Sequence, residues 1–597
     1  MTTTPRITNV ARRAVLLGLA SGTFVLATRL SPPASAQDKK FGGDAMSGGL
    51  RDDPRLFLSI ADDGTVTLLC IRAEMGQGIR TSFGMVVADE LEADLGRVKV
   101  LQAPGDQTRF GNQDTDGSRS MRHHFEPLRR IAAAARQMLE QEAAARWSVP
   151  ITEVKAENNG IVHGPSGRRF DFGALAKGAA ARPVPPRDSL VLKGTSQFRY
   201  IGKDNVPLID NLDITTGKAQ FGIDARIDGM AYAVVARPPV FGGKVKSFDA
   251  AKAMKVPGVL KVVTIEPPTM PTAFQPLGGV AVIAENTFAA IKGRSQLEIQ
   301  WDDGPNASYD SVQYRKTLEA AVAKPGKVVR NDGNVDAALA GAARRVTAEY
   351  YIPHLAQAPM EPPSATARVT PQGCEVWCST QNTEAVRAGL SKHFSMPLDK
   401  VVVHNLLLGG GFGRKSKPDY VSEAAILSHA MGGRPVKLTF TREDDLQHSF
   451  FHTVSVERVE AGLDASGKTV AWLHRTVAPT IFALFMPDPK HEAPLELAMG
   501  AVDNPFAIPN LRVENPEAAA HTRVGWLRSV SNIPHAFAIQ SFVAEIAAAV
   551  GRDPKDYLLE LIGPPRLIDA AAMSDAWLYG EDPKRYPFDT GRLRAVI

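Results

Sequence analysis

A glycine-rich stretch at residues 409–415 constrains this chain more than any other feature. It follows an apolar run at 401–408 and precedes a helical pattern at 421–431. The order predicts a strand, a glycine loop and a helix that the loop opens. Bare N–H groups at such a junction suit an anionic cofactor. A flexible glycine turn without a ligand is the alternative.

Two familiar phosphate loops do not fit this stretch. A Walker loop needs a glycine directly before its Lys-Ser pair, but Arg414 precedes Lys415 and Ser416. A dinucleotide fingerprint that starts at Gly409 or Gly411 would need a glycine at position 414 or 416. These positions are Arg414 and Ser416, so the fingerprint does not fit. The sequence therefore disfavours a nucleoside triphosphatase and a nicotinamide-linked dehydrogenase.

Length, charge and cysteine content exclude several other classes. A chain of 597 residues predicts roughly three or four structural units. A net charge of +5 without a basic run argues against nucleic acid as a partner. Three cysteines, Cys70, Cys374 and Cys378, are too few for a disulfide framework, and they lack the spacing of a zinc ribbon or iron–sulfur cluster. Alternation predicts a strand that carries Cys374 and Cys378 as small buried residues.

The N-terminus has the order of an export signal. Arg12 and Arg13 precede an apolar run at 14–27, and Ala34-Ser35-Ala36 resembles a cleavage site. Paired arginines favour the twin-arginine route to the periplasm, with a signal at 1–36 and a linker at 37–55. A retained membrane anchor and a meaningless basic pair are the alternatives, although the run is shorter than a spanning helix.

A second glycine element, Glu74-Met75-Gly76-Gln77-Gly78, lies between a predicted strand at 65–71 and a predicted helix at 81–93. A polar loop at 111–120 then precedes a helical pattern at 128–147. A compact α/β segment follows at 214–303. Its predicted strands and helices are at 231–235, 258–263 and 279–283, and at 249–255 and 286–293.

Together, several motifs resemble the xanthine oxidase family of molybdenum hydroxylases. The resemblance is closest to the branch of the isoquinoline 1-oxidoreductase beta subunit and membrane-bound aldehyde dehydrogenase, and it runs from about residue 56 to the end. The motifs that carry it are Glu74 to Gly78, Gly217 to Asp224, His354 with Pro359-Met360-Glu361-Pro362, Ser379 to Thr383, Gly409 to Arg414, Arg434 to Lys437 with Thr441 to Asp444, and Gly525 to Val530.

The resemblance implies an α/β (α+β) multi-domain large subunit that binds molybdopterin. It implies a permuted N-terminal cofactor-binding segment at 56–200 and a small α/β hammerhead-like domain at 201–305. A molybdopterin-binding domain would then occupy 306–597 and be incomplete at its C-terminus.

By the same resemblance, the cofactor would be molybdopterin cytosine dinucleotide, with no direct protein ligand to molybdenum. Gln381 would bond a molybdenum oxygen, the backbone of Phe412 and Gly413 would face the same centre, and Arg528 would lie beside it. The remaining implied cofactor contacts are Gly76, Gln77, Ser118, Ser120, Gly410 and Gly411.

The implied reaction is hydroxylation of an N-heteroaromatic compound or oxidation of an aldehyde, with water as the oxygen source. Electrons would pass to a small [2Fe-2S] partner subunit and then to a c-type cytochrome or a quinone. Ser416 stands where xanthine-specific members carry a glutamate, which disfavours purines. A peripheral position on the periplasmic side of the inner membrane is compatible with this electron path.

One departure from the family is that its general-base glutamate is not present in this chain. Gly580-Glu581 lies in a polar turn, and nothing marks Glu361 or Glu443 as the base. A truncated reading frame, a split enzyme and an incomplete sequence all stay open. The alternative function is therefore a catalytically incomplete fragment or scaffold half of a split enzyme, which would expose apolar surface without its partner.

Overall fold

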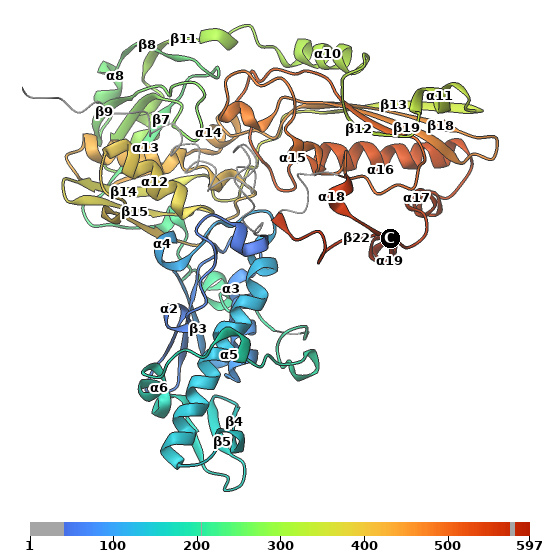
Figure 1. Ribbon diagram of the computed structural model, residues 1–597. Helices are drawn as coiled ribbons and strands as arrows, with labels where there is room; N and C mark the ends of the chain where they lie inside the picture. The colour runs from blue at the N-terminus through green and yellow to red at the C-terminus, as the bar shows by residue number, and fades with distance from the viewer. Residues whose placement is uncertain (1–40, 205, 574–579) are drawn as a thin grey trace, which may run out of the picture. The chain divides into compact units, whose positions relative to one another are not determined.

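The computed structural model describes residues 41–204, 206–573 and 580–597. The expected export signal lies outside these residues. The chain divides into two compact units (Figure 1). Of the described residues, the first unit comprises 41–204, 206–231, 363–411 and 415–439, and the second comprises 232–362, 412–414, 440–573 and 580–597.

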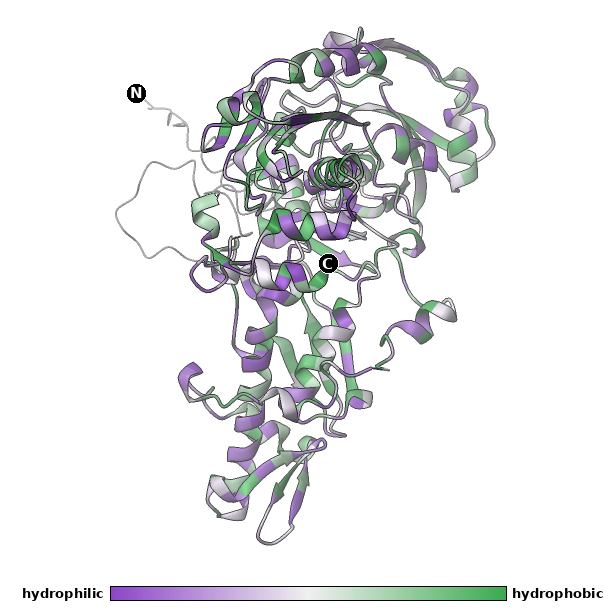
Figure 2. Ribbon diagram, turned by 90° about the vertical axis from the view of Figure 1, so that its right-hand side faces the viewer, coloured by the Kyte–Doolittle hydropathy of each residue, from purple (hydrophilic) through white to green (hydrophobic). Residues whose placement is uncertain are grey.

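A three-stranded sheet and two helices form the N-terminal part of the first unit. The strands, in the order β1-β2-β3, are Leu58–Ile60, Val66–Cys70 and Val98–Gln102. The helices α3 (Ile79–Leu91) and α5 (Arg119–Trp147) pack against each other and share one apolar core with the sheet (Figure 1). Hydrophilic and hydrophobic residues both occur along α5 (Figure 2), because only one side of the helix meets that core.

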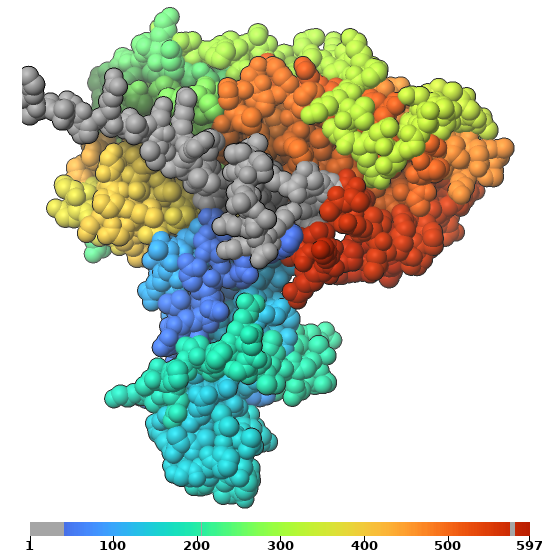
Figure 3. Space-filling view, viewed as in Figure 1, coloured from blue at the N-terminus to red at the C-terminus, as the bar shows by residue number. Residues whose placement is uncertain are grey.

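Smaller elements surround this core. They are α2 (Pro54–Phe57), α4 (Gln107–Phe110), the sheet of β4 (Val154–Glu157), β5 (Gly160–His163) and β6 (Arg169–Asp171), α6 (Phe172–Ala180) and α7 (Asn211–Thr215). A connector, residues 181–201, follows α6 without an α-helix or strand and lies on the surface (Figure 3).

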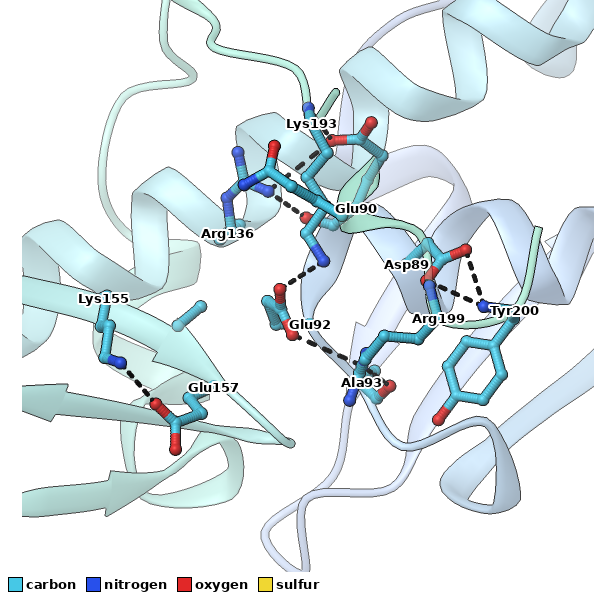
Figure 4. A network of polar contacts seen from close by, with 12 residues as sticks. Asp89, Glu90, Glu92, Ala93, Arg136, Lys155, Glu157, Lys193, Arg199 and Tyr200 are labelled. Carbon is cyan, nitrogen blue, oxygen red and sulfur yellow. Dashed lines mark hydrogen bonds and ion pairs between the residues drawn. The ribbon is translucent and has the colours of Figure 1, made fainter. Parts of the chain in front are cut away.

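Acidic residues at the end of α3 hold the distal part of the connector (Figure 4). The Asp89 carboxylate accepts hydrogen bonds from the N–H groups of Arg199 at 2.7 Å, Tyr200 at 3.1 Å and Ile201 at 2.8 Å. The Lys193 ammonium forms an ion pair with Glu92. Because Asp89 is fully buried, these bonds supply the partners that its carboxylate needs inside the protein.

The rest of the first unit is a sheet segment with the strand order β16-β15-β14-β17. Its strands are Val401–Asn405, Gly373–Cys378, Ser364–Thr370 and Val436–Thr439, and its helices are α12 (Thr383–Phe394) and α13 (Asp419–Ala430). Cys374 and Cys378 are buried on β15, as predicted. Strands β15 and β16 are parallel, so the loops that follow them leave the same edge of the sheet.

The second unit begins with the predicted α/β segment. Its elements are β7 (Ala231–Ala236), β8 (Lys244–Asp249), α8 (Ala251–Met254), β9 (Val259–Ile265), β10 (Gly279–Ala284), α9 (Thr287–Arg294) and β11 (Glu298–Asp302). Strand β10 pairs with β9, and β11 pairs with β8. The predicted strands and helices are confirmed, whereas the boundaries at 201 and 305 of a separate hammerhead-like domain stay a prediction.

A five-stranded sheet with the order β12-β20-β19-β18-β13 forms the core of the second unit. The strands are Lys327–Asp332, Leu511–Asn515, Thr469–Val477, Ser455–Leu463 and Arg344–Ile352. Helix α16 (Asn532–Ala549) packs on β13 and β18, and its Phe542 ring lies 5.2 Å from that of Trp472 on β19. Both rings are fully buried, so they anchor this core.

Short elements complete the second unit. They are α10 (Ser311–Val322), α11 (Val335–Ala340), α14 (Arg442–Gln447), α15 (Pro494–Leu497), α17 (Pro554–Ile562), α18 (Ala570–Met573), α19 (Thr590–Val596), β21 (Leu567–Ile568) and β22 (Phe588–Asp589). Within the described ranges, no single helix is long and apolar enough to cross a membrane. Helices α16 and α17 pass that test only as a pair, bent by 114°.

Candidate functional site

Two loops meet at the shared edge of β15 and β16 in the first unit. Gln381 follows β15, and its backbone N–H donates to the Lys415 carbonyl at 3.0 Å. Gly411 follows β16, and a Cβ added to it would lie 2.5 Å from Gln381 Oε1. No side chain fits at residue 411 without displacing that amide, so glycine is required by close approach.

The polar loop at 111–120 joins the same cluster through Thr115. The Thr115 N–H donates to the Gln381 carbonyl at 2.9 Å, and Gln381 Nε2 donates to the Thr115 carbonyl at 2.9 Å. Gln381 is 5% exposed, and the Nε2 bond fixes the orientation of its side-chain amide inside the protein. Its Oε1 atom is thereby held beside Gly411.

The element Glu74 to Gly78 forms a third side of the cluster. The Leu408 N–H donates to the Glu74 carbonyl at 2.9 Å, and Met75 Sδ lies 3.3 Å from a Cβ added at Gly411. The Glu74 carboxylate accepts from the N–H groups of Gly76 at 2.9 Å, Gly78 at 3.0 Å and Arg80 at 3.1 Å. Since Gly78 is the N-cap of α3, this carboxylate already occupies the helix N-terminus.

The side chain of Gln77 forms two hydrogen bonds within its own loop. Its Oε1 accepts from the Met75 N–H at 2.7 Å, and its Nε2 donates to the Ala73 carbonyl at 2.8 Å. A primary amide carries a second N–H and a second lone pair, so these bonds orient Gln77 without exhausting it. Gly76, at φ +96°, has no atom within 4 Å of an added Cβ, so its backbone borders open space.

Ser118 and Ser120 lie at the start of α5, which begins nine residues before the predicted helix at 128–147. Ser118 is the N-cap, at φ +54°, and its side chain makes no capping hydrogen bond. The Ser120 carbonyl accepts from His124 Nδ1 at 3.0 Å. A helix of 29 residues therefore presents its N-terminal N–H groups beside the polar loop.

Charged groups lie buried next to this loop. Arg72 is fully buried, and its Nε and Nη1 atoms have no hydrogen-bond partner among the residues that the structure describes. The buried Asp114 Oδ1 atom likewise has no hydrogen-bond partner among these described residues. Burial and the nearby Asp116 raise the pKa of Asp114 to about 7. Buried polar atoms without a partner are costly, so a polar group bound next to this loop would offset part of that cost.

The other predicted residues belong to the second unit. The Arg528 N–H donates to the Phe412 carbonyl at 3.0 Å. Gly413 has φ +93°, and a Cβ there would lie 2.6 Å from the Trp526 carbonyl oxygen. Phe412 is 37% exposed and has φ +53°, a conformation that is costly for a residue with a side chain. The structure therefore places Phe412, Gly413 and Arg528 together.

One prediction is wrong. The glycine loop does not open a helix, because the 3₁₀ turn Arg414–Ser416 follows it and α13 begins only at Asp419. The apolar run also leaves strand geometry after Asn405. Pro418 as the N-cap separates the loop from the helix, since the residue before a proline disfavours helical dihedrals. The helix itself, Asp419–Ala430, agrees with the predicted pattern at 421–431 to within two residues. The positive end of a helix dipole consequently lies elsewhere than at Gly409 and Gly410.

The sequence predicted no role for three residues that shape these clusters. They are Glu74 at the start of α3, Thr115 beside Gln381, and Trp526 beside Gly413. Only Glu74 had a usable signal, because an acidic side chain shortly before a helix favours its N-terminus. Among the described residues, no group of three or more His, Cys, Asp or Glu side chains could hold a metal ion.

Comparison with known proteins adds family models and relatives. Two models named molybdopterin cofactor-binding domain match residues 320–558 and 12–215. A membrane-bound aldehyde dehydrogenase of Gluconacetobacter polyoxogenes, whose name also carries pyrroloquinoline-quinone, is 32% identical over 85% of this chain and 67% of that protein. The chain belongs to the xanthine oxidase family of molybdenum hydroxylases, as a molybdopterin-binding large subunit.

Two further relatives name different substrates. The beta subunit of isoquinoline 1-oxidoreductase from Brevundimonas diminuta is 29% identical over 93% of this chain and 75% of its own length. A nicotinate dehydrogenase subunit of Pseudomonas putida is 28% identical over 92% of this chain but only 46% of its own length. Among solved structures, quinoline 2-oxidoreductase from Pseudomonas putida 86 matches with a TM-score of 0.46 and 19% identity, over 58% of this chain and 48% of its own.

Proposed function

We propose that this chain is the molybdopterin-binding part of an oxidoreductase that hydroxylates an N-heteroaromatic compound or oxidises an aldehyde. The observation that carries the proposal is the cluster of Gln381, Gly411, Met75 and Thr115 in the first unit of a chain that matches two molybdopterin-binding models. When bound, the cofactor supplies two-electron oxidation of a carbon with water as the oxygen source.

The chain's own residues would orient that group. Gln381 would present its side-chain amide, which its Nε2 bond to the Thr115 carbonyl holds in place. Ser118 and Ser120 lie where α5 begins, where N–H groups favour phosphate, and Gly76 and Gln77, in the loop before α3, would contact the same cofactor. Phe412 would form an apolar wall for a planar substrate, with Gly410 and Gly413 giving the turn its geometry. The cytosine dinucleotide form of the cofactor is part of this proposal.

The proposal includes a partner. The chain has three cysteines, and Cys70, Cys374 and Cys378 are all buried and free, so they do not form the ligand set of a cluster. Electrons would leave through a small [2Fe-2S] subunit and pass to a c-type cytochrome or a quinone. We place the complex in the periplasm, at the inner membrane surface, on the strength of Arg12, Arg13 and the apolar run that follows them.

Metal and nucleotide analysis tests the cofactor. Protein purified with its neighbouring subunits should contain molybdenum and release cytidine monophosphate on acid hydrolysis. Gln381→Ala should lower both, because it removes the oriented amide and leaves the Thr115 carbonyl without its donor. Pyrroloquinoline quinone without molybdenum would refute the proposal.

A separate experiment tests the location. Replacing Arg12 and Arg13 by lysine should retain the chain in the cytoplasm, as judged by fractionation, if the twin-arginine route exports it. Unchanged export of this double variant would contradict that part of the proposal alone.

A further inference from the structure

Two left-handed turns meet in the second unit. Phe412 and Gly413 have φ values of +53° and +93°, and Ser529 and Val530 have φ values of +75° and +48°. Left-handed dihedrals are unusual for Phe and Ser and strongly disfavoured for a β-branched residue such as Val530. The hydrogen bond from the Arg528 N–H to the Phe412 carbonyl, 3.0 Å long, joins the two turns. Such conformations persist only where the surroundings over-determine them.

An alternating set of guanidinium groups and aromatic rings adjoins these turns. In order of contact, its members are Arg237, Phe440, Arg414, Phe450 and Arg523, which we call the cation–aromatic column. The distances from each guanidinium carbon to the ring centroid are 3.7 Å for Arg237 and 5.5 Å for Arg414 on Phe440, and 5.2 Å for Arg414 and 3.8 Å for Arg523 on Phe450.

All five side chains of the column are at least nine-tenths buried. Exposure is 6% for Arg237, 3% for Arg523, 1% for Phe440 and none for Arg414 and Phe450. Attraction between a cation and an aromatic face is strongest when water is excluded, as it is here. Burial, together with Arg237 and Arg523, lowers the pKa of His448 to about 3 against the opposing effect of Asp444, which lies 3.8 Å from Arg237.

The column is connected to both turns through the backbone. Arg414 directly follows Gly413. The carbonyl of Arg523 accepts a hydrogen bond from the Phe451 N–H at 2.8 Å. Three residues after Arg523 comes Trp526, the residue whose carbonyl oxygen Gly413 approaches. Gln357 Nε2 donates to the carbonyls of Phe450 at 2.6 Å and Trp526 at 2.9 Å. The Phe450 ring therefore lies between the residue after the first turn and the segment that leads into the second.

We propose that Phe450, with Arg414 and Arg523 on its ring, positions the turns at 412–413 and 529–530 for cofactor binding. In this role the three residues need not touch substrate or cofactor. The column holds the backbone on both sides of the Arg528–Phe412 hydrogen bond, so the backbone of Phe412 and Gly413 is preorganised before any ligand arrives. That the turns bind a cofactor rests on the proposed function, whereas the contacts between the column and the turns do not depend on it.

Hydrogen–deuterium exchange on the cofactor-free full-length chain tests the geometry, using a host that does not make molybdopterin. Phe450→Leu removes the aromatic face but keeps an apolar side chain, and Arg523→Lys keeps the charge but loses the planar stack. Phe542→Leu is the matched control, because Phe542 is equally buried and packs on Trp472 in the sheet core.

We expect Phe450→Leu to speed exchange in peptides covering 409–416 and 525–532 by about tenfold or more, as for local opening, relative to the control. Arg523→Lys should give a smaller increase in the same peptides. In a host that makes the cofactor, Phe450→Leu should also lose most of its molybdenum, whereas Phe542→Leu should keep it. These three results together would support the proposal.

The opposite pattern would overturn it. If both leucine variants speed exchange equally across the second unit, the column is only part of the general core. If Phe450→Leu leaves the two peptides unchanged, the column does not hold the turns, whatever the metal content. Absence of molybdenum from the unaltered chain would refute the proposed function instead, and the exchange comparison would still decide whether the column positions the turns.

Discussion

The two glycine elements of this chain look alike in sequence but use glycine for different reasons. In Glu74 to Gly78, Gly78 caps a helix directly, and a carboxylate from the same element takes the N–H groups at its start. In the loop that contains Gly411 and Gly413, no helix follows at once, and a Cβ added to either of these two glycines would meet another atom within 2.6 Å.

This difference separates two meanings of a glycine loop. A loop that opens a helix is an anion site only if nothing in the protein already satisfies its N–H groups, and Glu74 does so here. A loop without a helix can still be a site, because close packing brings bare backbone next to an oriented amide such as that of Gln381. Glycine content alone therefore does not tell these cases apart.

The largest effect should come from Gly413→Ala. An added methyl group would meet the Trp526 carbonyl at 2.6 Å in a left-handed conformation, so both backbone segments would have to move. We expect a loss of about 3 kcal/mol in the free energy of unfolding, measured by urea titration of the cofactor-free chain. A loss no greater than that of Gly76→Ala would show that packing does not distinguish the two elements.

A second effect should appear as a pH dependence of the polar loop that contacts Gln381. Asp114 has a pKa of about 7 against an ordinary value of 3.8, so its stabilising contribution is complete below about pH 4 and is lost as pH rises through 7. Asp114→Asn cannot ionise and should remove this fall, of which about 2.7 kcal/mol lies above pH 5. Urea midpoints at pH 5, 6, 7 and 8 measure it. Parallel curves for the two proteins would contradict the assignment.

Glu74→Gln tests the first element directly. The amide keeps one oxygen for Gly76 and Gly78 but presents an N–H group to the Arg80 N–H, and the negative charge at the helix start is lost. We expect about 1 to 2 kcal/mol of destabilisation by urea titration. Asp53→Asn, at the exposed cap of the four-residue helix α2, is the control and should cost less. Equal costs would mean that Glu74 acts only as an ordinary cap.

The smallest effect should be that of Gly76→Ala. No atom lies within 4 Å of the added methyl group, so only the φ of +96° opposes it. We expect a cost of about 1 kcal/mol in the same titration, with molybdenum content as a second measurement. If stability falls little but molybdenum is lost, the open space beside Gly76 is where the cofactor approaches. If molybdenum is unchanged, Gly76 borders solvent only.

The parts of the fold that the sequence predicted were those governed by local patterns. Short apolar runs predicted β7, β9 and β10, and alternation predicted the strand that buries Cys374 and Cys378. The break between the glycine loop and α13 depends on Pro418, and the early start of α5 depends on a polar sequence without apolar periodicity. Local signals do not encode which loops meet, so the pairing of Gln381 with Thr115 could not be predicted from the residues alone.

The connector has a consequence for how the chain tolerates cleavage. Arg187 is exposed within it, whereas residues 199–201 are bound by the buried Asp89 and Lys193 pairs with Glu92. A trypsin cut after Arg187 would therefore leave two fragments that stay associated, because the downstream fragment is held by side chains rather than by its peptide bond to the upstream one. Covalent continuity at residue 187 is then dispensable, and new termini placed there should be compatible with the fold.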